Sequence, residues 1–347
     1  MSRVLVLRLS ALGDVAMLIP VLYSAAGHYP EDEFLLATKS PLLPIFEHRP
    51  DNVRIIPVFS KDQHKGLKGL ARLIRELSAE QIDLVADTHD VLRSQQIRRY
   101  FRLKGKKVEV IDKGRWEKWK LTCRRHKDLH PLKTSIERYH DVFKALGYDF
   151  PIDFQSIFEY GGKDFSSIEH VVGKKEGTWI GIAPFAKHKG KSYPLEKMEK
   201  VLEILIGKPQ TTVFLFGGKE EEEHLEMWAQ QHEHVISVAG HFSFSSELLV
   251  MSCMDVMLTM DSGNMHLASL VNVPVVSIWG ATHPYTGFCG YRQNPDNCIA
   301  IDTLPCRPCS VFGDKKCFRK DYACLQEITP ERVAEQIGKQ LKVKSEK

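Results

Sequence analysis

Short apolar runs alternate with helical patterns along the chain. In the first half, runs rich in Val, Leu and Ile predict strands, and they lie at residues 4–9, 34–37, 53–57, 84–86 and 108–111. Helical periodicity fills several of the intervals between them. An alternation of this kind predicts a mainly parallel sheet with helices on both faces.

The second half repeats the same alternation more clearly. The strands expected there are TWIGIA, TTVFLF, HVISVAG, DVMLTM and VPVVSIWG, with helical patterns between them. The stretch EYGGKDFSSIEHVVGKKEG is polar, rich in glycine and weakly periodic, which is typical of a linker. We therefore expect an N-terminal Rossmann-like domain at 1–160, a linker at 161–177, a second such domain at 178–330, and a C-terminal helix and tail at 331–347.

Length and composition agree with two folded domains. The chain has 347 residues, of which 43% are hydrophobic and 27% charged, as in ordinary globular proteins. The N-terminus, MSRVLVLRL, enters a strand directly and lacks the arrangement of a secretory signal. Since no apolar stretch approaches the roughly 20 residues needed to span a bilayer, we expect a cytoplasmic protein without a transmembrane helix.

Positive charge is concentrated in one segment. Residues 91–139 contain 16 Lys and Arg and five Asp and Glu, a balance of +11, whereas the whole chain carries +4. Tryptophans interleave this segment in GRWEKWKLTCRRHK. Such a surface attracts phosphates of nucleic acid, anionic lipid headgroups or an acidic glycan. A solvated helix face with Lys and Arg stems over apolar neighbours is an equally good interpretation.

Ligands of doubly wound sheets bind beyond the carboxyl ends of the strands, so the turns there are the candidate sites. The first turn, SALGDV, has only Gly13 of a G-x-G-x-x-G fingerprint, which argues against a nicotinamide cofactor. Asp14 lies where a helix N-cap is expected. A purely structural cap is therefore one interpretation of this carboxylate, and a chemical role is the other.

Two turns of the second half also carry unusual chemistry. IAPFAKHKGKSYP places Lys187, Lys189 and Lys191 before a helix, and this charge suits a phosphate or diphosphate, although loop lysines are often merely solvated. In MDSGNMHLASLVNVPVVSIWG, Asp261 ends a strand and is expected to cap a helix. Backbone N–H groups at Ser262 and Gly263 could approach an anion closely there.

The order of RLSALGD, KSYP, DSGNMHLA and VPVVSIWGATHP resembles the heptosyltransferases, which form glycosyltransferase family nine. DLVADTHDVLRS and RYHDVFKALG are also similar to segments of this family. The resemblance implies a GT-B fold of two facing Rossmann-like domains, with acceptor mainly on the first and nucleotide sugar on the second. It implies an inverting, metal-independent transfer of heptose from ADP-heptose to the lipopolysaccharide inner core, and the sequence contains no Asp-x-Asp clamp.

The resemblance also implies roles for individual residues. Asp14 would be the general base. Lys191, with Ser262 and Gly263, would bind the donor phosphates, although the turn PFAKHKGKSYP has lysines where many members have small hydroxyl residues. The residues expected at the donor sugar and nucleotide are Asp261, His266, Gly217 and either Glu220 or Glu221.

The expected acceptor is a lipid A-core glycolipid on the inner face of the inner membrane, with the protein in peripheral contact with that anionic surface. Its predicted contacts are Arg93, Arg98, Arg99, Arg124 and Arg125. No nucleic-acid partner is expected. Two alternatives stay open: a GT-B transferase that uses another nucleotide sugar, and a noncatalytic protein that binds anionic ligands through the basic segment.

Four of the eight cysteines cluster near the C-terminus, at Cys306, Cys309, Cys317 and Cys324. Their spacing allows a structural zinc site, although the second pair lacks the usual tight spacing. A loop that is reduced or tied by a disulfide is the favoured interpretation, and no cofactor is expected to be required. Cys123, Cys253, Cys289 and Cys298 are interpreted as incidental or buried thiols.

Overall fold

The computed structural model describes residues 1–345, so the last two residues of the predicted tail, 346–347, lie outside the described residues. The chain divides into two compact units. The first contains Met1–Lys113 and Ser135–Gly162, and the second contains Gly114–Thr134 and the chain from Lys163 onward. Segments that are distant in sequence therefore share a unit.

The first unit is built on a five-stranded sheet in the order β3-β2-β1-β4-β5. All neighbouring strands pair in parallel. Parallel strands that are covered on both faces are buried throughout, which explains why β1 reads as a continuous apolar run. The strands are β1 (Arg3–Leu7), β2 (Glu33–Lys39), β3 (Val53–Val58), β4 (Leu84–Asp87) and β5 (Lys107–Val110).

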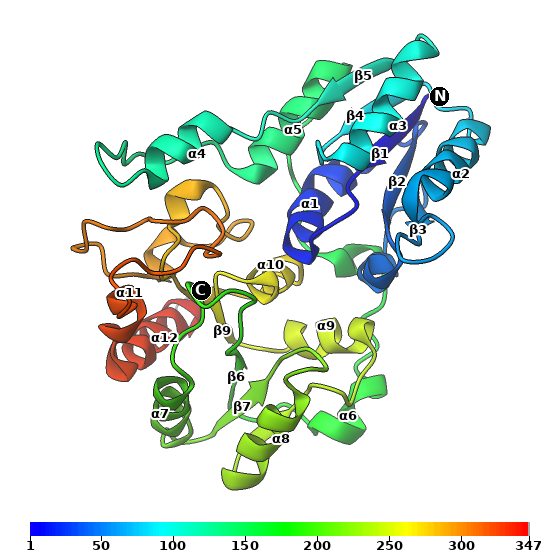
Figure 1. Ribbon diagram of the computed structural model, residues 1–347. Helices are drawn as coiled ribbons and strands as arrows, with labels where there is room; N and C mark the ends of the chain where they lie inside the picture. Colours follow the sequence, from blue (N-terminus) through cyan, green and yellow to red (C-terminus); the bar gives the residue numbers. More distant parts are fainter. Residues whose placement is uncertain (346–347) are drawn as a thin grey trace. The chain divides into compact units, whose positions relative to one another are not determined.

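Helices cover both faces of this sheet. Leu5 and Leu7 share a core cluster with Leu73 of one helix and Phe101 of another. On the other face a long helix buries twelve consecutive residues and contacts the helix that follows the excursion 114–134. In Figure 1 the colours of these elements run from blue through cyan to green. The helices are α1 (Leu12–His28), α2 (Gly66–Ala79), α3 (Leu92–Leu103) and α5 (Ser135–Leu146), with 3-10 turns at Ser40–Phe46 and Ile157–Tyr160.

The second unit has a six-stranded parallel sheet in the order β11-β10-β9-β6-β7-β8. Its strands are β6 (Thr178–Ala183), β7 (Thr211–Leu215), β8 (Val235–Ser237), β9 (Val256–Met260), β10 (Val275–Ile278) and β11 (Cys298–Ile299). Because β6 and β9 are neighbours in the middle of the sheet, the turns that follow them lie beside each other.

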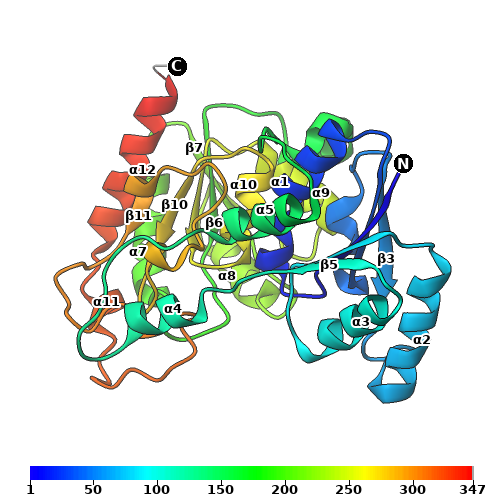
Figure 2. The same ribbon diagram turned by 90° about the horizontal axis from the view of Figure 1, so that it is seen from above.

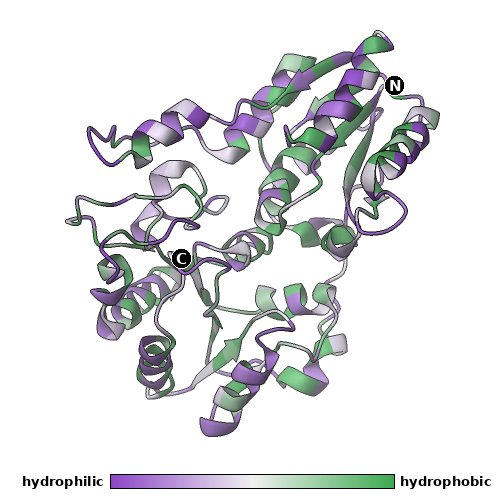
Figure 3. Cartoon of the chain, in the orientation of Figure 1, coloured by the Kyte–Doolittle hydropathy of each residue, from purple (hydrophilic) through white to green (hydrophobic). Residues whose placement is uncertain are grey.

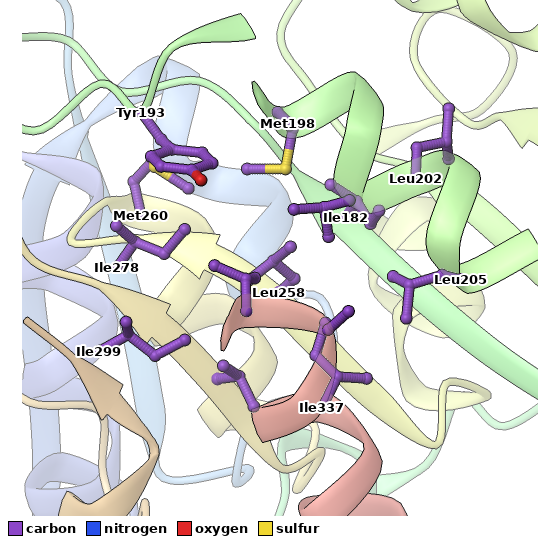
Figure 4. Packing of buried hydrophobic residues seen from close by; sticks show 14 of the residues in the cluster. Ile182, Tyr193, Met198, Leu202, Leu205, Leu258, Met260, Ile278, Ile299 and Ile337 are labelled. Carbon is purple, nitrogen blue, oxygen red and sulfur yellow. The ribbon is translucent and has the colours of Figure 1, made fainter. Parts of the chain in front are cut away.

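The core of the second unit lies between this sheet and two long helices, α7 and α12, which pack against each other (Figure 2). Figure 4 shows Ile182 and Leu258 of the sheet packed against Met198 and Ile337 of these helices. In Figure 3 the strands are mainly green and the outer helices carry purple residues. The helices are α4 (Arg115–Thr122), α6 (Ser166–Val172), α7 (Leu195–Ile206), α8 (Glu222–Gln231), α9 (Phe244–Ser252), α10 (Gly263–Leu270), α11 (Ala323–Gln326) and α12 (Pro330–Ser345).

The predicted fold class, two Rossmann-like α/β domains with parallel sheets, is confirmed. Two details differ from the expected organisation. The expected linker contains α6, which forms because Ile168 and Val172 are buried. The segment 114–134, expected in the first domain, belongs to the second unit, where the Lys127 ammonium donates to the Cys306 carbonyl at 2.8 Å.

Within the described residues, no helix is both long enough and apolar enough to cross a membrane.

Candidate active site

Asp14 lies in the turn between β1 and α1 of the first unit. The helix begins at Leu12, so Asp14 is its third residue, and the expected N-cap position belongs to Ala11, whose backbone is extended. Oδ2 of Asp14 accepts the backbone N–H of Ala11 at 3.3 Å. This is how an acid at the third helical position stabilises a helix start. The cap prediction is therefore wrong in position, although the carboxylate does bond the helix start.

A buried arginine holds the same carboxylate. Arg8 Nη2 lies 2.6 Å from Asp14 Oδ2, with 7% of the Arg8 side chain and 33% of the Asp14 side chain exposed. Arg8 also donates from Nη1 to the Thr88 carbonyl at 2.6 Å and lies over the ring of Tyr139. Because these contacts fix the guanidinium, they also fix the carboxylate of Asp14 beyond the carboxyl end of β1.

His89 completes this polar group. Its Nδ1 accepts the backbone N–H of Leu9 at 3.2 Å. Burial, with the nearby positive charges of Arg8 and Lys113, lowers the pKa of His89 to about 3. The ring is therefore neutral at pH 7, and its role here is to hold the strand end that leads to Asp14.

The predicted acceptor arginines of α3 have different environments. Arg98 Nη1 lies 2.8 Å from the fully buried Asp87 and 2.9 Å from Asp90, so it closes the turn after β4. Arg93 donates to the His64 carbonyl at 2.7 Å. Arg99 is exposed. The other two predicted contacts, Arg124 and Arg125, are exposed in the second unit.

In the second unit, the turns after β6 and β9 meet through an ion pair. Lys191 Nζ lies 2.8 Å from Asp261 Oδ2, and the two side chains are 14% and 3% exposed. Among the three lysines of the turn, Lys187 is exposed and Lys189 lies over the ring of Tyr322. Lys191 is thus the lysine that the fold directs to the carboxyl end of β9.

The helix α10 begins immediately after this aspartate. Ser262, not Asp261 as expected, is its N-cap residue, because the helical conformation starts at Gly263. His266 is buried in the first turns of the helix. The start of α10 therefore presents backbone N–H groups beside the Lys191–Asp261 pair, an arrangement that favours an anion.

Arg307, which the sequence analysis did not single out, fixes the turn that follows β10. Its buried guanidinium donates to the carbonyls of Gly280 at 2.6 Å, Thr282 at 3.0 Å and Trp279 at 3.2 Å. It also donates to the Ile301 carbonyl and to Asp302. One side chain thereby satisfies most of the turn's carbonyl oxygens.

This turn supports the lysine turn directly. The Ala281 N–H donates to the Gly190 carbonyl at 2.8 Å. A Cβ at Gly280 would lie 2.5 Å from the Gly190 oxygen, and a Cβ at Gly190 would lie 2.7 Å from the Gly313 oxygen. Only glycine fits at such contacts. Lys191 is therefore held by a tightly packed set of three turns.

The predicted nucleotide residues lie after β7. Glu221 Oε2 accepts the Gly218 N–H at 2.6 Å, and a Cβ at Gly217 would lie 3.0 Å from that oxygen. Glu220 faces a different surface, where it lines an open cavity with Glu223 and Glu226. The two candidate acids thus have distinct environments: Glu221 is folded onto the turn, and Glu220 lies just before α8 and lines the open cavity beside that helix.

The cysteine loop forms no disulfide, since all eight cysteines are free. Among residues 1–345, no group of three or more His, Cys, Asp or Glu side chains is arranged to hold a metal ion. Burial raises the pKa of Cys324 to about 12, so this thiol is protonated at neutral pH. The backbone of the loop has a structural role, because the N–H of Cys309 donates to the Ala281 carbonyl at 3.0 Å.

The family model for glycosyltransferase family 9 (heptosyltransferase) matches residues 70–317, which is most of the chain. The chain belongs to glycosyltransferase family 9. This confirms the resemblance inferred from the motifs, and with it the prediction of an enzyme that transfers a glycosyl group.

Family 9 members are similar to the chain over almost its full length. Lipopolysaccharide heptosyltransferase 1 of Pseudomonas aeruginosa is 26% identical, and the match covers 96% of this chain and 97% of that protein. The structure of Escherichia coli ADP-heptose lipopolysaccharide heptosyltransferase II has a TM-score of 0.72 at 19% identity, covering 99% and 100% of the two chains. Escherichia coli heptosyltransferase WaaC with ADP has a TM-score of 0.68 at 20% identity, covering 97% and 99%. At these identities the structural likeness establishes the fold.

Sequence reasoning missed the residues that position the site in this family 9 chain. Arg8 could have been suspected, because it is a cation directly after a buried strand. Arg307 gave no comparable signal, since it lies in an irregular loop and its partners are backbone carbonyls. Outside these site residues, burial raises the pKa of Glu247, in the first turn of α9, to about 7.

Proposed function

We propose that this chain transfers heptose from ADP-heptose to the inner core of lipopolysaccharide, with inversion and without a metal. The observation that carries the proposal is the Lys191–Asp261 pair at the start of α10, which lies at the carboxyl ends of neighbouring parallel strands. This is the position where open α/β sheets bind their ligands. The printed names of the relatives, which are lipopolysaccharide heptosyltransferases, support the choice of donor and acceptor.

For the donor, we assign the diphosphate to Lys191 and the backbone N–H groups of Ser262 and Gly263. Positive charge placed there stabilises the negative charge that develops on the leaving group. Asp261 and His266 would line the donor sugar. Gly217 and Glu221 would lie at the nucleotide, with Glu220 as the alternative acid. The WaaC structure, which is described as holding ADP, supports an adenine nucleotide.

For the acceptor, we assign the general base to Asp14. A hydroxyl oxygen of the acceptor forms a bond to the anomeric carbon as the bond from that carbon to the diphosphate oxygen breaks. The electron pair leaves with ADP, and the hydroxyl proton passes to Asp14. Attack from the face opposite the diphosphate inverts the anomeric configuration. Arg8 and the Ala11 N–H both hold Oδ2. Among the described residues, no hydrogen bond involves Oδ1, so this oxygen is available to the hydroxyl.

The proposal requires no metal for the chemical step, because Lys191 and the start of α10 supply positive charge at the diphosphate. Transfer should therefore persist at full rate after dialysis against EDTA. A loss of activity that is restored by Mg²⁺ or Mn²⁺ would contradict this part of the proposal.

The arginines assigned to the phosphorylated acceptor remain Arg93, Arg98, Arg99, Arg124 and Arg125.

The decisive experiment measures transfer of radiolabelled heptose from ADP-heptose to a heptose-deficient core acceptor. The wild-type chain should transfer the label, and Asp14→Asn should lower the rate by about 10²- to 10⁴-fold, the usual contribution of a general base. The variant should still show the ADP-induced rise in melting temperature, because donor binding does not use Asp14. If Asp14→Asn lost only about 1 kcal/mol of stability and kept its turnover, the carboxylate would have a structural role alone.

The same assay separates the alternatives. If UDP or GDP but not ADP raised the melting temperature, the donor would be a UDP- or GDP-sugar rather than ADP-heptose. An absence of transfer with several acceptors and donors, together with salt-dependent binding of anions, would replace the enzyme by a binding protein.

A further inference from the structure

The helix α4 presents two exposed indoles. Trp116 and Trp119 are 64% and 56% exposed, and their rings stack with centroids 4.8 Å apart and an interplanar angle of 15°. They are three residues apart, so they share one side of the helix. Large exposed aromatic groups that gather in one place mark an interaction surface rather than ordinary solvent-facing positions.

A second segment adds to this surface. The loop that contains the cysteines lies beside α4 in the same unit, as Figures 1 and 2 both show. Arg124 lies over the ring of Phe318 at 4.6 Å, and Phe318 is itself half exposed. The two segments enclose an open cavity of about 700 Å³. Residues that line it include Trp119, Arg124, Lys127, Lys315, Lys316 and Phe318.

The net charge of this surface is positive. Residues 115–128 contain six Lys and Arg and two acids, and residues 315–320 contain four Lys and Arg and no acid. Some of this charge is engaged: Arg319 pairs with Asp321 at 2.8 Å, and Lys127 donates to backbone carbonyls. Lys315 and Lys316 are exposed at the rim of the cavity. The surface therefore combines an indole pair with an excess of cations.

This combination favours an anionic bilayer over other polyanions. Indole rings prefer the headgroup region of a membrane, where their apolar and polar parts are both accommodated. Lys and Arg beside them meet the lipid phosphates. The half-exposed Phe312 is part of the same region, since it stacks on Phe288, over which Lys118 lies. A free glycan offers no apolar phase for the exposed phenyl groups, and the bases of a nucleic acid stack on such rings only where they are unpaired.

We infer that α4 and residues 305–320 form a docking surface for an anionic lipid bilayer, with Trp116 and Trp119 in the headgroup region and the basic cavity at the lipid phosphates. This inference goes beyond the proposed transfer reaction, because it needs neither Asp14 nor the donor turns. It shares with the proposed function only Arg124, one of the arginines assigned to the acceptor. It also assigns membrane contact to specific residues, which the charge count of residues 91–139 could not do.

Vesicle sedimentation with the full chain tests the inference. The wild type should sediment with vesicles of 30% phosphatidylglycerol and 70% phosphatidylcholine, much less with pure phosphatidylcholine, and less at 0.5 M NaCl. Trp116→Ala/Trp119→Ala and Lys315→Glu/Lys316→Glu should each lower the partition coefficient at least tenfold. Because the side chains that these variants change are exposed, thermal melting should remain within 2 °C of the wild type.

Matched control variants distinguish binding through this surface from nonspecific adsorption to vesicles. Phe165→Ala removes an exposed aromatic ring elsewhere, and Lys65→Glu/Lys68→Glu makes the same charge change on another exposed face. Both should bind vesicles within twofold of the wild type. Equal loss in the controls, or wild-type binding by the two surface variants, would overturn the inference. So would failure of the wild type to bind phosphatidylglycerol vesicles while it binds an oligonucleotide or a soluble phosphorylated core glycan.

The outcome is independent of the proposed function. Sedimentation uses no donor and no acceptor, so vesicle binding can be present in a chain that fails to transfer heptose. Conversely, the surface variants should retain the rate of transfer to a delipidated, soluble core acceptor. If they lost that rate together with vesicle binding, the surface would be an acceptor site and not a membrane surface.

Discussion

Removal of the Arg307 guanidinium is expected to loosen the turn that supports Lys191. Five hydrogen bonds leave this side chain, and four of their acceptors are backbone carbonyls. The substitution Arg307→Met keeps much of the volume and removes every donor. The carbonyls of Trp279, Gly280 and Thr282 would then lose this donor in a region that is otherwise buried.

The expected magnitude follows from these carbonyls. A buried polar group that loses its partner costs about 1–3 kcal/mol, and three such groups set an upper range of several kcal/mol. Relaxation of the turn and entry of water lower that sum. We therefore expect the free energy of unfolding of the second unit to fall by about 3–5 kcal/mol, which is below the sum for three fully unsatisfied carbonyls. Arg307→Lys should recover part of it, since an ammonium cannot reach all of the carbonyls at once.

Urea unfolding followed by tryptophan fluorescence is the appropriate measurement. All five tryptophans, at positions 116, 119, 179, 228 and 279, belong to the second unit, so the signal reports on that unit alone. The ADP-induced rise in melting temperature should also shrink, because Gly190 loses a fixed partner at Ala281. A loss of less than 1 kcal/mol with an unchanged response to ADP would refute the reasoning, since water would then satisfy the carbonyls.

Three further predictions concern single ionisable groups. Lys191→Met should destabilise the chain by about 3–5 kcal/mol, because it leaves Asp261 buried and unpaired. In urea titrations, Lys191→Met/Asp261→Asn should recover most of this stability, but it should not recover the ADP-induced rise in melting temperature. If the double variant recovered both the stability and the response to ADP, Lys191 would not belong to the donor site. Arg8→Lys should lower the rate of heptose transfer at least tenfold with little change in the KM for ADP-heptose, since one ammonium cannot bridge Asp14 and the Thr88 carbonyl as the guanidinium does; an equal rate would show that Asp14 needs no such support. Burial raises the folded-state pKa of Glu247 to about 7, so the stability associated with its protonated form is fully present below its unfolded pKa, near 4.5, and is lost as pH rises through about 7. Glu247→Gln should therefore have the melting temperature of the wild type near pH 4 and a higher one above pH 7. A constant difference in melting temperature between the two proteins across this range would contradict the shift.

Much of the fold could be predicted from the sequence, because parallel strands buried on both faces give unbroken apolar runs. The ten strands expected from such runs are present, with ends displaced by up to three residues. The two-residue β11 could not be found, since Cys298 and Ile299 alone give no periodicity. The packing of α4 in the second unit could not be predicted either. Its charge suggests solvent or a polyanion, and its partners follow almost two hundred residues later in the sequence.

The candidate site was predictable only in its charged members. Asp14, Lys191 and Asp261 are conspicuous because each follows an apolar strand. That Lys191 and Asp261 form a pair depends on β6 and β9 being neighbours, which strand order decides and local sequence does not. Likewise, Arg98 was indistinguishable from Arg99 in the sequence. In the structure Arg98 is tied to Asp87 and Asp90, and Arg99 is exposed.

The excursion of residues 114–134 has a consequence for the order in which the protein can fold during its synthesis. By the time Gly162 has left the ribosome, every residue of the first unit is available. That unit can therefore fold while the excursion 114–134 remains an unpacked loop. Lys127, however, must wait for Cys306, its partner 179 positions later. At about 5–20 residues per second, this delay is roughly 10–40 s. During that interval the indole pair and its cations are carried by an unanchored loop, so a nascent chain has its best opportunity for premature association with anionic surfaces before its second sheet is complete.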